Sequence, residues 1–207
     1  MFSFLNKTKK PDGYIALFNL EDWWNNSFSG NEQKHIVEVF QPLGASKDIL
    51  IVGHLQHTNS DRPLMLLSSL AGWFNNSKDR DIAYKIIAKA EEYVQSTKDI
   101  LDIHFFHQTK MEIFYKGNDS STTLQKSINA CLNQIEIADK ASTAFQAKYH
   151  KLPIHKGYEL LCTIYERQGK FEECIKLMEQ AKNQGWNGDW DNHIKRIRER
   201  IFKLNRS

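Results

Sequence analysis

The sequence predicts an all-α protein in which antiparallel helix pairs are stacked side by side. The 207 residues contain only 4 Pro and 10 Gly, which is too few for many short strands joined by tight turns. From residue 63 onward, apolar residues recur at spacings of three and four, and short polar segments separate these periodic stretches. Hydrophobic residues make up 41% of the chain, which is ordinary for a folded globular protein.

The periodic stretches predict a series of helices after a less regular N-terminal segment. Pro63 suits the first turn of a helix, and Gly185 suits the position after a helix C-terminus. The expected helices span residues 63 to 76, 79 to 95, 97 to 116, 123 to 141, 155 to 168, 171 to 184 and 189 to 204. The chain is thus divided into a partly helical N-terminal segment, 1–60, and a helical region, 61–207, that ends in a capping helix, 189–204.

Within the N-terminal segment, Ser29 followed by Glu32 predicts a capping box at the start of a helix. We expect the adjacent Trp23 and Trp24 to pack in the core rather than to form a platform for a ligand.

The structure of residues 1–13 and 45–60 is left open. The short apolar run from Ile49 to Val52 fits a strand and a helical turn equally.

The net charge of +3 is unevenly distributed. Residues 1–10 carry +3 and residues 191–207 carry +4, whereas the body between them carries −4. This is not the composition of a chain that binds nucleic acid throughout. The basic C-terminal helix is expected to present a polar outer face that ends the array, and contact with an acidic partner or nucleic acid is the alternative.

The cysteines indicate a reducing compartment. Cys131, Cys162 and Cys174 are an odd number without a CxxC spacing, so neither a disulfide framework nor a zinc knuckle is expected. The first residues have a short apolar start followed by charges, the reverse of a signal peptide, and no stretch is long enough to span a membrane. We expect a cytoplasmic protein without membrane contact.

One spacing of small, large and small residues recurs in three of the expected helices. Small residues at such positions let neighbouring helices approach closely. The three sets are Ala83, Ile87 and Ala90; Cys131, Ile135 and Ala138; and Cys174, Met178 and Ala181. We expect Ala83, Ala90, Ala138, Cys174 and Ala181 to be buried at helix contacts. Self-similarity of this kind is typical of stacked helical repeats.

Residues 155–188 resemble a tetratricopeptide repeat, a 34-residue helix-turn-helix unit. The residues at the pattern's spacings are Tyr158, Leu161, Cys162, Tyr165, Gly169, Phe171, Cys174, Met178 and Ala181. Trp186 stands where the family usually has proline. Residues 64–97 match more weakly, and the pair at about 100–140 is degenerate, with a lengthened loop. The resemblance implies a short α-solenoid, and an unrelated antiparallel helix bundle is the alternative.

The resemblance also implies a function. The first helices of such pairs form a concave groove that binds a peptide or another protein. The implied groove residues are Met65, Ser68, Asn75, Asn76, Phe105, Gln108, Glu112, Tyr115, Lys156, Glu159, Thr163, Glu166 and Arg167. These residues are a mixture of apolar, polar, acidic and basic types. They do not include the run of lysines and arginines that forms a carboxylate clamp. We expect a non-catalytic interaction or scaffold module with a protein or peptide partner and without a cofactor.

A metal-dependent enzyme is the rival hypothesis, with His54, His57, His104 and His107 as ligands. Neither histidine pair has the His-Glu-x-x-His spacing, and GxSxG, P-loop and GxGxxG motifs are absent. The second pair lies at helical spacing among apolar residues, which favours a packing face. Acidic residues such as Asp99 and Asp102 are expected at solvated helix faces and caps.

Finally, the last helix is expected to cover the apolar side of the preceding one. The residues that should lie against it are Trp190, Ile194, Ile197 and Ile201. Trp186 should pack at the same junction.

Overall fold

The computed structural model describes residues 13–53, 62–117 and 120–206, and most of these residues are helical. The helices are α1 (Gly13–Leu17), α2 (Glu21–Ser27), α3 (Gly30–Val39), α4 (Pro63–Trp73), α5 (Arg80–Glu91), α6 (Ile100–Lys116), α7 (Ser121–Glu136), α8 (Ala138–Tyr149), α9 (Lys156–Arg167), α10 (Phe171–Asn183) and α11 (Trp190–Leu204). Within these ranges, the only β pairing is a single parallel bridge between Ile154 and Asn187. The all-α prediction is confirmed for the described residues.

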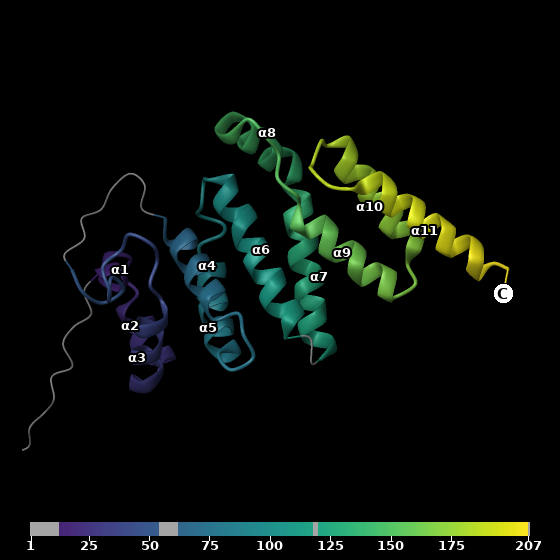
Figure 1. Cartoon of the computed structure of the whole chain (residues 1–207). Coiled ribbons are helices and arrows are strands. Elements are labelled where there is room, and N and C mark those ends of the chain that lie inside the picture. Colours follow the sequence, from purple (N-terminus) through teal and green to yellow (C-terminus); the bar gives the residue numbers. More distant parts are fainter. Residues whose placement is uncertain (1–12, 54–61, 118–119, 207) are drawn as a thin grey trace, which may run out of the picture.

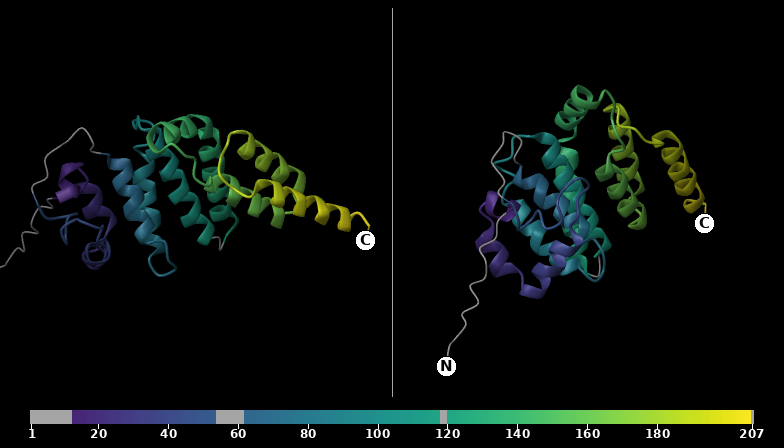
Figure 2. Two further views of the ribbon diagram at one scale, coloured as in Figure 1. Left: turned by 45° about the horizontal axis from the view of Figure 1, so that its top comes forward. Right: turned by 60° about the vertical axis from the view of Figure 1, so that its left-hand side comes forward.

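Consecutive helices pack in pairs. α4 contacts α5, α6 contacts α7, and α9 contacts α10. Neighbouring pairs meet through α4 with α6 and through α7 with α9, and α11 lies against α10. Figures 1 and 2 show the resulting row, with the N-terminal helices at one end and α11 at the other.

Six of the predicted helices occur within a few residues of their expected bounds, but the helix predicted over 123 to 141 is wrong. The helix in this region, α7, ends at Glu136. A separate helix, α8, follows Ile137 and ends at Tyr149, with His150 as its C-cap at a φ of 56°. α8 turns away because its buried residues Ala138, Ala141 and Phe145 face α6. No glycine or proline marks this break in the sequence, so local pattern did not reveal it.

The N-terminal helices share a core with the following pairs. Ile15, Trp24 and Phe28 belong to the same buried cluster as Leu67 and Ile86. The predicted burial of Trp24 is therefore confirmed, and Trp23 is partly buried against this cluster.

Local backbone contacts define the ends of two N-terminal helices. Ser29 and Glu32 form the predicted capping box at α3. Carbonyls of Ile49 and Leu50 accept the N–H groups of Tyr14 and Ile15 at 3.1 and 3.0 Å. The N–H of Val52 donates to the carbonyl of Asp48 at 2.9 Å, so the apolar run at Ile49 is a helical turn that caps α1, and not a strand.

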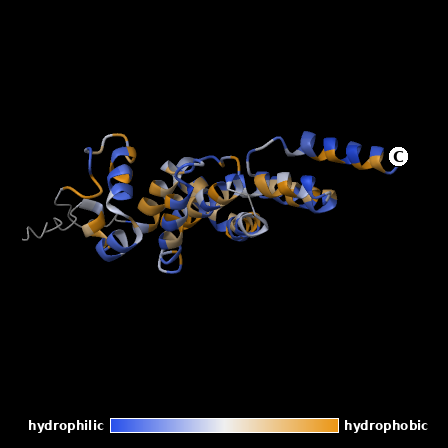
Figure 3. Ribbon diagram, turned by 90° about the horizontal axis from the view of Figure 1, so that it is seen from below, coloured by the Kyte–Doolittle hydropathy of each residue, from blue (hydrophilic) through white to orange (hydrophobic). Residues whose placement is uncertain are grey.

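A second buried cluster joins α8, α9, α10 and α11. The five small residues predicted at helix contacts, Ala83, Ala90, Ala138, Cys174 and Ala181, are all fully buried. Trp190, Ile194 and Ile197 pack in this cluster beside Met178, and Ile201 is partly buried against it, as predicted for the last helix. Figure 3 shows hydrophobic residues on the side of α11 that faces the neighbouring helix and hydrophilic ones on the other.

None of the helices in the described ranges has the length and apolar character that crossing a membrane would require.

Candidate functional site

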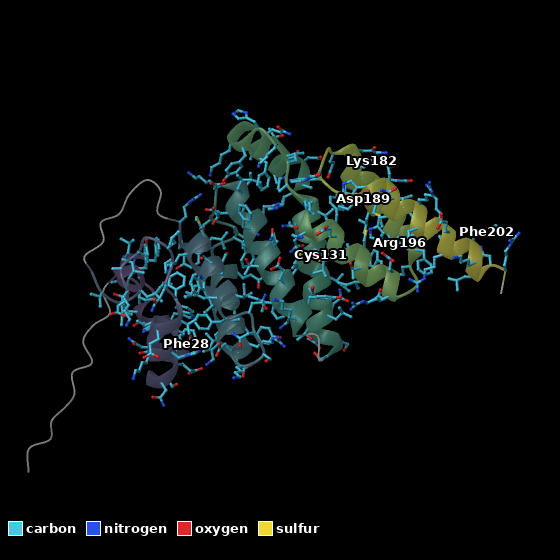
Figure 4. All side chains as sticks on the ribbon, in the orientation of Figure 1. Phe28, Cys131, Lys182, Asp189, Arg196 and Phe202 are labelled. Carbon is cyan, nitrogen blue, oxygen red and sulfur yellow. The ribbon has the colours of Figure 1, made fainter. Side chains whose placement is uncertain are left out.

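A hollow on the described surface, called here the main hollow, lies between α6, α9 and α11. Its volume is about 530 Å³. The residues that line it are Met111, Glu112, Tyr115, Lys116, Lys156, Glu159, Leu160, Thr163, Asp189, Trp190, His193 and Arg196. Figure 4 labels Asp189, the N-cap residue of α11, and Arg196 further along this helix. The hollow is therefore built by three helices that are far apart in the sequence.

A buried amide fixes α9 against α6. Nε2 of Gln134, on α7, donates a hydrogen bond to the carbonyl of His104 at 2.9 Å. Its Oε1 accepts the N–H of Gly157 at 2.8 Å. Position 157 has room only for glycine, because a Cβ would stand 2.7 Å from that oxygen. Gln134 thus sets the distance between two walls of the main hollow.

Two polar contacts fix the third wall. The indole N–H of Trp190 donates to the carbonyl of Trp186 at 2.8 Å, at the start of α11. Nε2 of His193 donates to Oε1 of Glu166, on α9, at 2.5 Å. Trp186 is buried as predicted, but its ring stacks on His104, 5.8 Å between centroids, and so packs toward α6 as well.

The lining of the main hollow combines apolar surface with charges of both signs. Lys156 forms an ion pair with Glu159 at 2.8 Å. Lys116 and Arg196 form no ion pair with any described residue, so their charges are open to a ligand. The hydroxyl of Tyr115 is buried and makes no hydrogen bond within the described residues. The side chains of Lys116, Arg196 and Tyr115 are therefore hydrogen-bond donors that a ligand could engage beside an apolar surface.

A smaller hollow, called here the second hollow, lies between α4, α6 and α8 and has a volume of about 230 Å³. It is lined by Arg62, Met65, Ser68, Ser69, Leu101, Asp102, Phe105, Thr109, Lys148 and Tyr149. On α6, Phe105, Thr109, Glu112 and Lys116 follow at spacings of four, three and four, which places them on one helix face. The two hollows therefore flank a common strip of α6.

The predicted groove residues divide among several places. Glu112, Tyr115, Lys156, Glu159 and Thr163 line the main hollow, and Met65, Ser68 and Phe105 line the second. Three others lie beside the main hollow: Gln108 donates to Glu112, Glu166 accepts from His193, and the Arg167 guanidinium lies 5.7 Å from the Tyr115 ring centroid. Asn75 and Asn76 lie in the turn after α4 and line neither hollow.

Asp102 corrects the expectation of a solvated acidic residue. Its side chain is only 4% exposed, although Asp99 caps α6 as expected by accepting the N–H of Leu101. Oδ1 of Asp102 accepts from Arg62 at 3.0 Å, while its buried Oδ2 makes no hydrogen bond within the described residues. Burial raises the pKa of the Asp102 carboxyl, and Arg62 partly opposes this.

The histidines of the metal hypothesis do not form a cluster in the described part of the chain. His104 packs its ring against His155 and Phe145, with centroids 5.1 and 5.2 Å away. Burial lowers the pKa of His104 and of His107 to about 4. His54 and His57 lie outside the described residues. No group of three or more His, Cys, Asp or Glu within the described ranges is placed to hold a metal ion.

The three cysteines are buried and unpaired. Burial raises the pKa of Cys131 to about 12, and a hydrogen bond with Cys174, together with burial, raises the pKa of Cys162. Both effects disfavour the thiolate, which is the nucleophilic form.

The α11 wall of the main hollow was not predicted, because α11 was interpreted only as a cap with a solvated basic side. The missed residues are Asp189, Trp190, His193 and Arg196. A signal was present: α11 begins at Trp190, 34 residues after α9 begins at Lys156, which is one period of the resembled repeat. In a repeat of that period, a helix at this position is the first helix of a further pair and lies on the same side as the first helix before it.

Comparisons of the chain with protein-family models, with curated proteins and with solved structures gave no match. Inferences about function therefore rest on the geometry described above.

Proposed function

We propose that this chain is a non-catalytic interaction module that binds an extended segment of a partner protein in the main hollow. The observation that supports this proposal most strongly is the 530 Å³ hollow with walls from α6, α9 and α11. Its volume falls in the range typical of ligand-binding clefts, about 300–1,000 Å³. Five of the groove residues implied by the resemblance line it.

The proposal includes a short tetratricopeptide-like solenoid made of the pairs α4–α5, α6–α7 and α9–α10, with α11 as a further first helix. In this arrangement α4, α6, α9 and α11 are the first helices of their pairs. The main hollow lies between three of them, and the second hollow lies between α4, α6 and α8. Stacked pairs expose these helices along one continuous surface. A partner segment lying across them would contact several helices at once.

The chemistry of the lining favours a protein partner. Tyr115, Leu160 and Trp190 supply apolar and aromatic surface, which is enriched at protein interfaces. Lys116 and Arg196 supply charges without partners in the described residues, which suit the polar groups of a peptide.

A displayed library of random linear peptides tests the proposal. Selection on the purified protein should yield binders, and Thr163→Arg, which places a long charged side chain in the main hollow, should weaken them at least tenfold. Asn133→Arg is the matched control, because Asn133 is exposed on α7 and lines neither hollow. Failure to select any binder, or equal binding by Thr163→Arg, would refute the proposed function.

A further inference from the structure

Asp102, which lines the second hollow, has a buried acceptor atom without a donor among the described residues. Oδ2 of Asp102 is buried and makes no hydrogen bond within the described residues, although Oδ1 is satisfied by Arg62. A buried polar atom without a partner costs free energy, so such atoms in folded proteins call for an explanation. Because Asp102 lines the second hollow, a ligand bound in this hollow would lie next to the Asp102 side chain.

The walls around this carboxylate are largely apolar and aromatic. Met65, Phe105 and Tyr149 are 48%, 44% and 46% exposed, which is high for large hydrophobic residues. Leu101, which is buried, also lines the hollow. At about 230 Å³, the hollow is smaller than typical ligand clefts but of a scale suited to one long side chain.

We infer that the second hollow is a subsite for one lysine or arginine side chain of the partner segment, whose head group donates a hydrogen bond to Oδ2 of Asp102. The long aliphatic stem of either side chain matches the apolar walls, and its cation suits the faces of Phe105 and Tyr149. This inference rests on the proposed function, because it places the subsite on the same face as the main hollow.

Lys148 shows that a lysine side chain can lie beside the Tyr149 ring, and it would compete with a partner's cation for this position. Its Nζ lies 5.3 Å from the Tyr149 ring centroid, and both residues line the second hollow, but it makes no hydrogen bond to Asp102. Since Lys148 is exposed, a partner's cation can displace it at little cost.

The geometry of α6 fixes the spacing of the partner segment. Phe105, beside the second hollow, and Glu112, beside the main hollow, are seven residues apart on one helix face. At about 1.5 Å per residue, this separation is about 10 Å along the helix axis. An extended chain spans it with about three residues. The basic residue should therefore lie about three positions from the residue that enters the main hollow.

The random-peptide selection is repeated on wild type and on Asp102→Asn, with folding verified by thermal unfolding. Wild type should select peptides with Lys or Arg enriched at one position, and Asp102→Asn should lose this enrichment. Replacing that lysine with norleucine should weaken binding to wild type by about ten- to a hundredfold. Asp99→Asn is the matched control: it removes a charge beside Arg62 and retains an N-cap residue, but it lies outside the second hollow.

Two further variants keep the test decisive if Asp102→Asn does not fold. Ser69 is exposed at the second hollow, so Ser69→Phe should block the subsite and remove the basic preference. Lys148→Ala removes the competing cation and should strengthen that preference.

The outcomes separate the two proposals. Binders without a fixed basic position, or with one that Asp102→Asn and Ser69→Phe both retain, would overturn the subsite alone. Absence of any binder would overturn the subsite together with the proposed function.

Discussion

The backbone N–H of Gly157 donates a hydrogen bond to the side-chain carbonyl of Gln134 at 2.8 Å, in the buried space where α7 meets α9. The side-chain nitrogen of Gln134 donates a hydrogen bond to the carbonyl of His104, on α6, at 2.9 Å. One fully buried side chain thereby ties α7 to the two helices that face each other across the main hollow.

Gln134→Leu should lower the free energy of unfolding by about 2–4 kcal/mol. The substitution leaves a buried N–H at Gly157 and a buried carbonyl at His104 without partners, and each costs roughly 1–3 kcal/mol. Urea unfolding measures the change. Gln125→Leu, at an exposed position of the same helix, should change stability by less than about 0.5 kcal/mol. Equal stabilities of the two variants would contradict the bridging role.

Ala181→Phe should destabilise the protein by about 1–3 kcal/mol, because Ala181 is fully buried in the cluster that joins α9, α10 and α11. Ala147→Phe, at an exposed position of α8, adds the same volume and is the control. Thermal or urea unfolding of both variants checks the expectation. A neutral Ala181→Phe would show that the helices do not pack as closely as described.

The buried histidines predict a loss of stability in mild acid. Burial lowers the pKa of His104 and His107 to about 4 and that of His155 to about 3, whereas an unfolded histidine titrates near 6.5. Below pH 6.5 the unfolded state therefore binds protons that the native state does not. The contribution of the buried, neutral histidines to the free energy of unfolding is therefore fully present above about pH 6.5. As the pH falls toward 4, the free energy of unfolding decreases by up to about 1.4 kcal/mol per pH unit for each histidine.

A matched pair of variants tests this slope. His155→Asn keeps an N-cap acceptor at α9 but removes a titrating group, so the slope between pH 6.5 and 5 should fall by about one proton. His150→Asn, at an exposed position with φ of 56° that asparagine tolerates, is the matched control for exchanging a histidine for asparagine. An unchanged slope in His155→Asn would show that His155 is already accessible to protons in the native state.

Removal of residues 189–207 should lower the midpoint of thermal unfolding and promote aggregation. α11 covers an apolar side of the cluster that contains Met178, and without Trp190, Ile194 and Ile197 this side faces water. Light scattering and thermal unfolding of the truncated chain measure both effects. A truncated chain that is monodisperse and equally stable would contradict the covering role of α11.

Much of the helical architecture followed from local pattern. The capping box at Ser29 depends on neighbouring residues only, and the buried alanines follow from helical spacing. The break at Ile137 did not, because the sequence favours helix on both sides of it. What separates α7 from α8 is packing on α6, which is a contact between distant residues.

The residues of the candidate site were harder to predict from the sequence than the helices, because tertiary contacts bring them together. The resemblance found the α6 and α9 walls of the main hollow, but not the α11 wall, since a basic amphipathic helix looks the same whether its polar side faces water or a groove. The buried state of Asp102 was also missed, because its sequence neighbours do not reveal that Arg62 and α8 cover it.

Photo-crosslinking of a selected peptide tests the central claim most directly, because it reports where the partner segment lies. A benzophenone at the peptide's central position, followed by mass spectrometry of the cross-linked fragments, identifies the contacted residues. The account predicts cross-links to the walls of the main hollow, at residues such as Tyr115, Thr163 and His193. Cross-links confined to the exposed surface of α7, for example at Leu132, would contradict it.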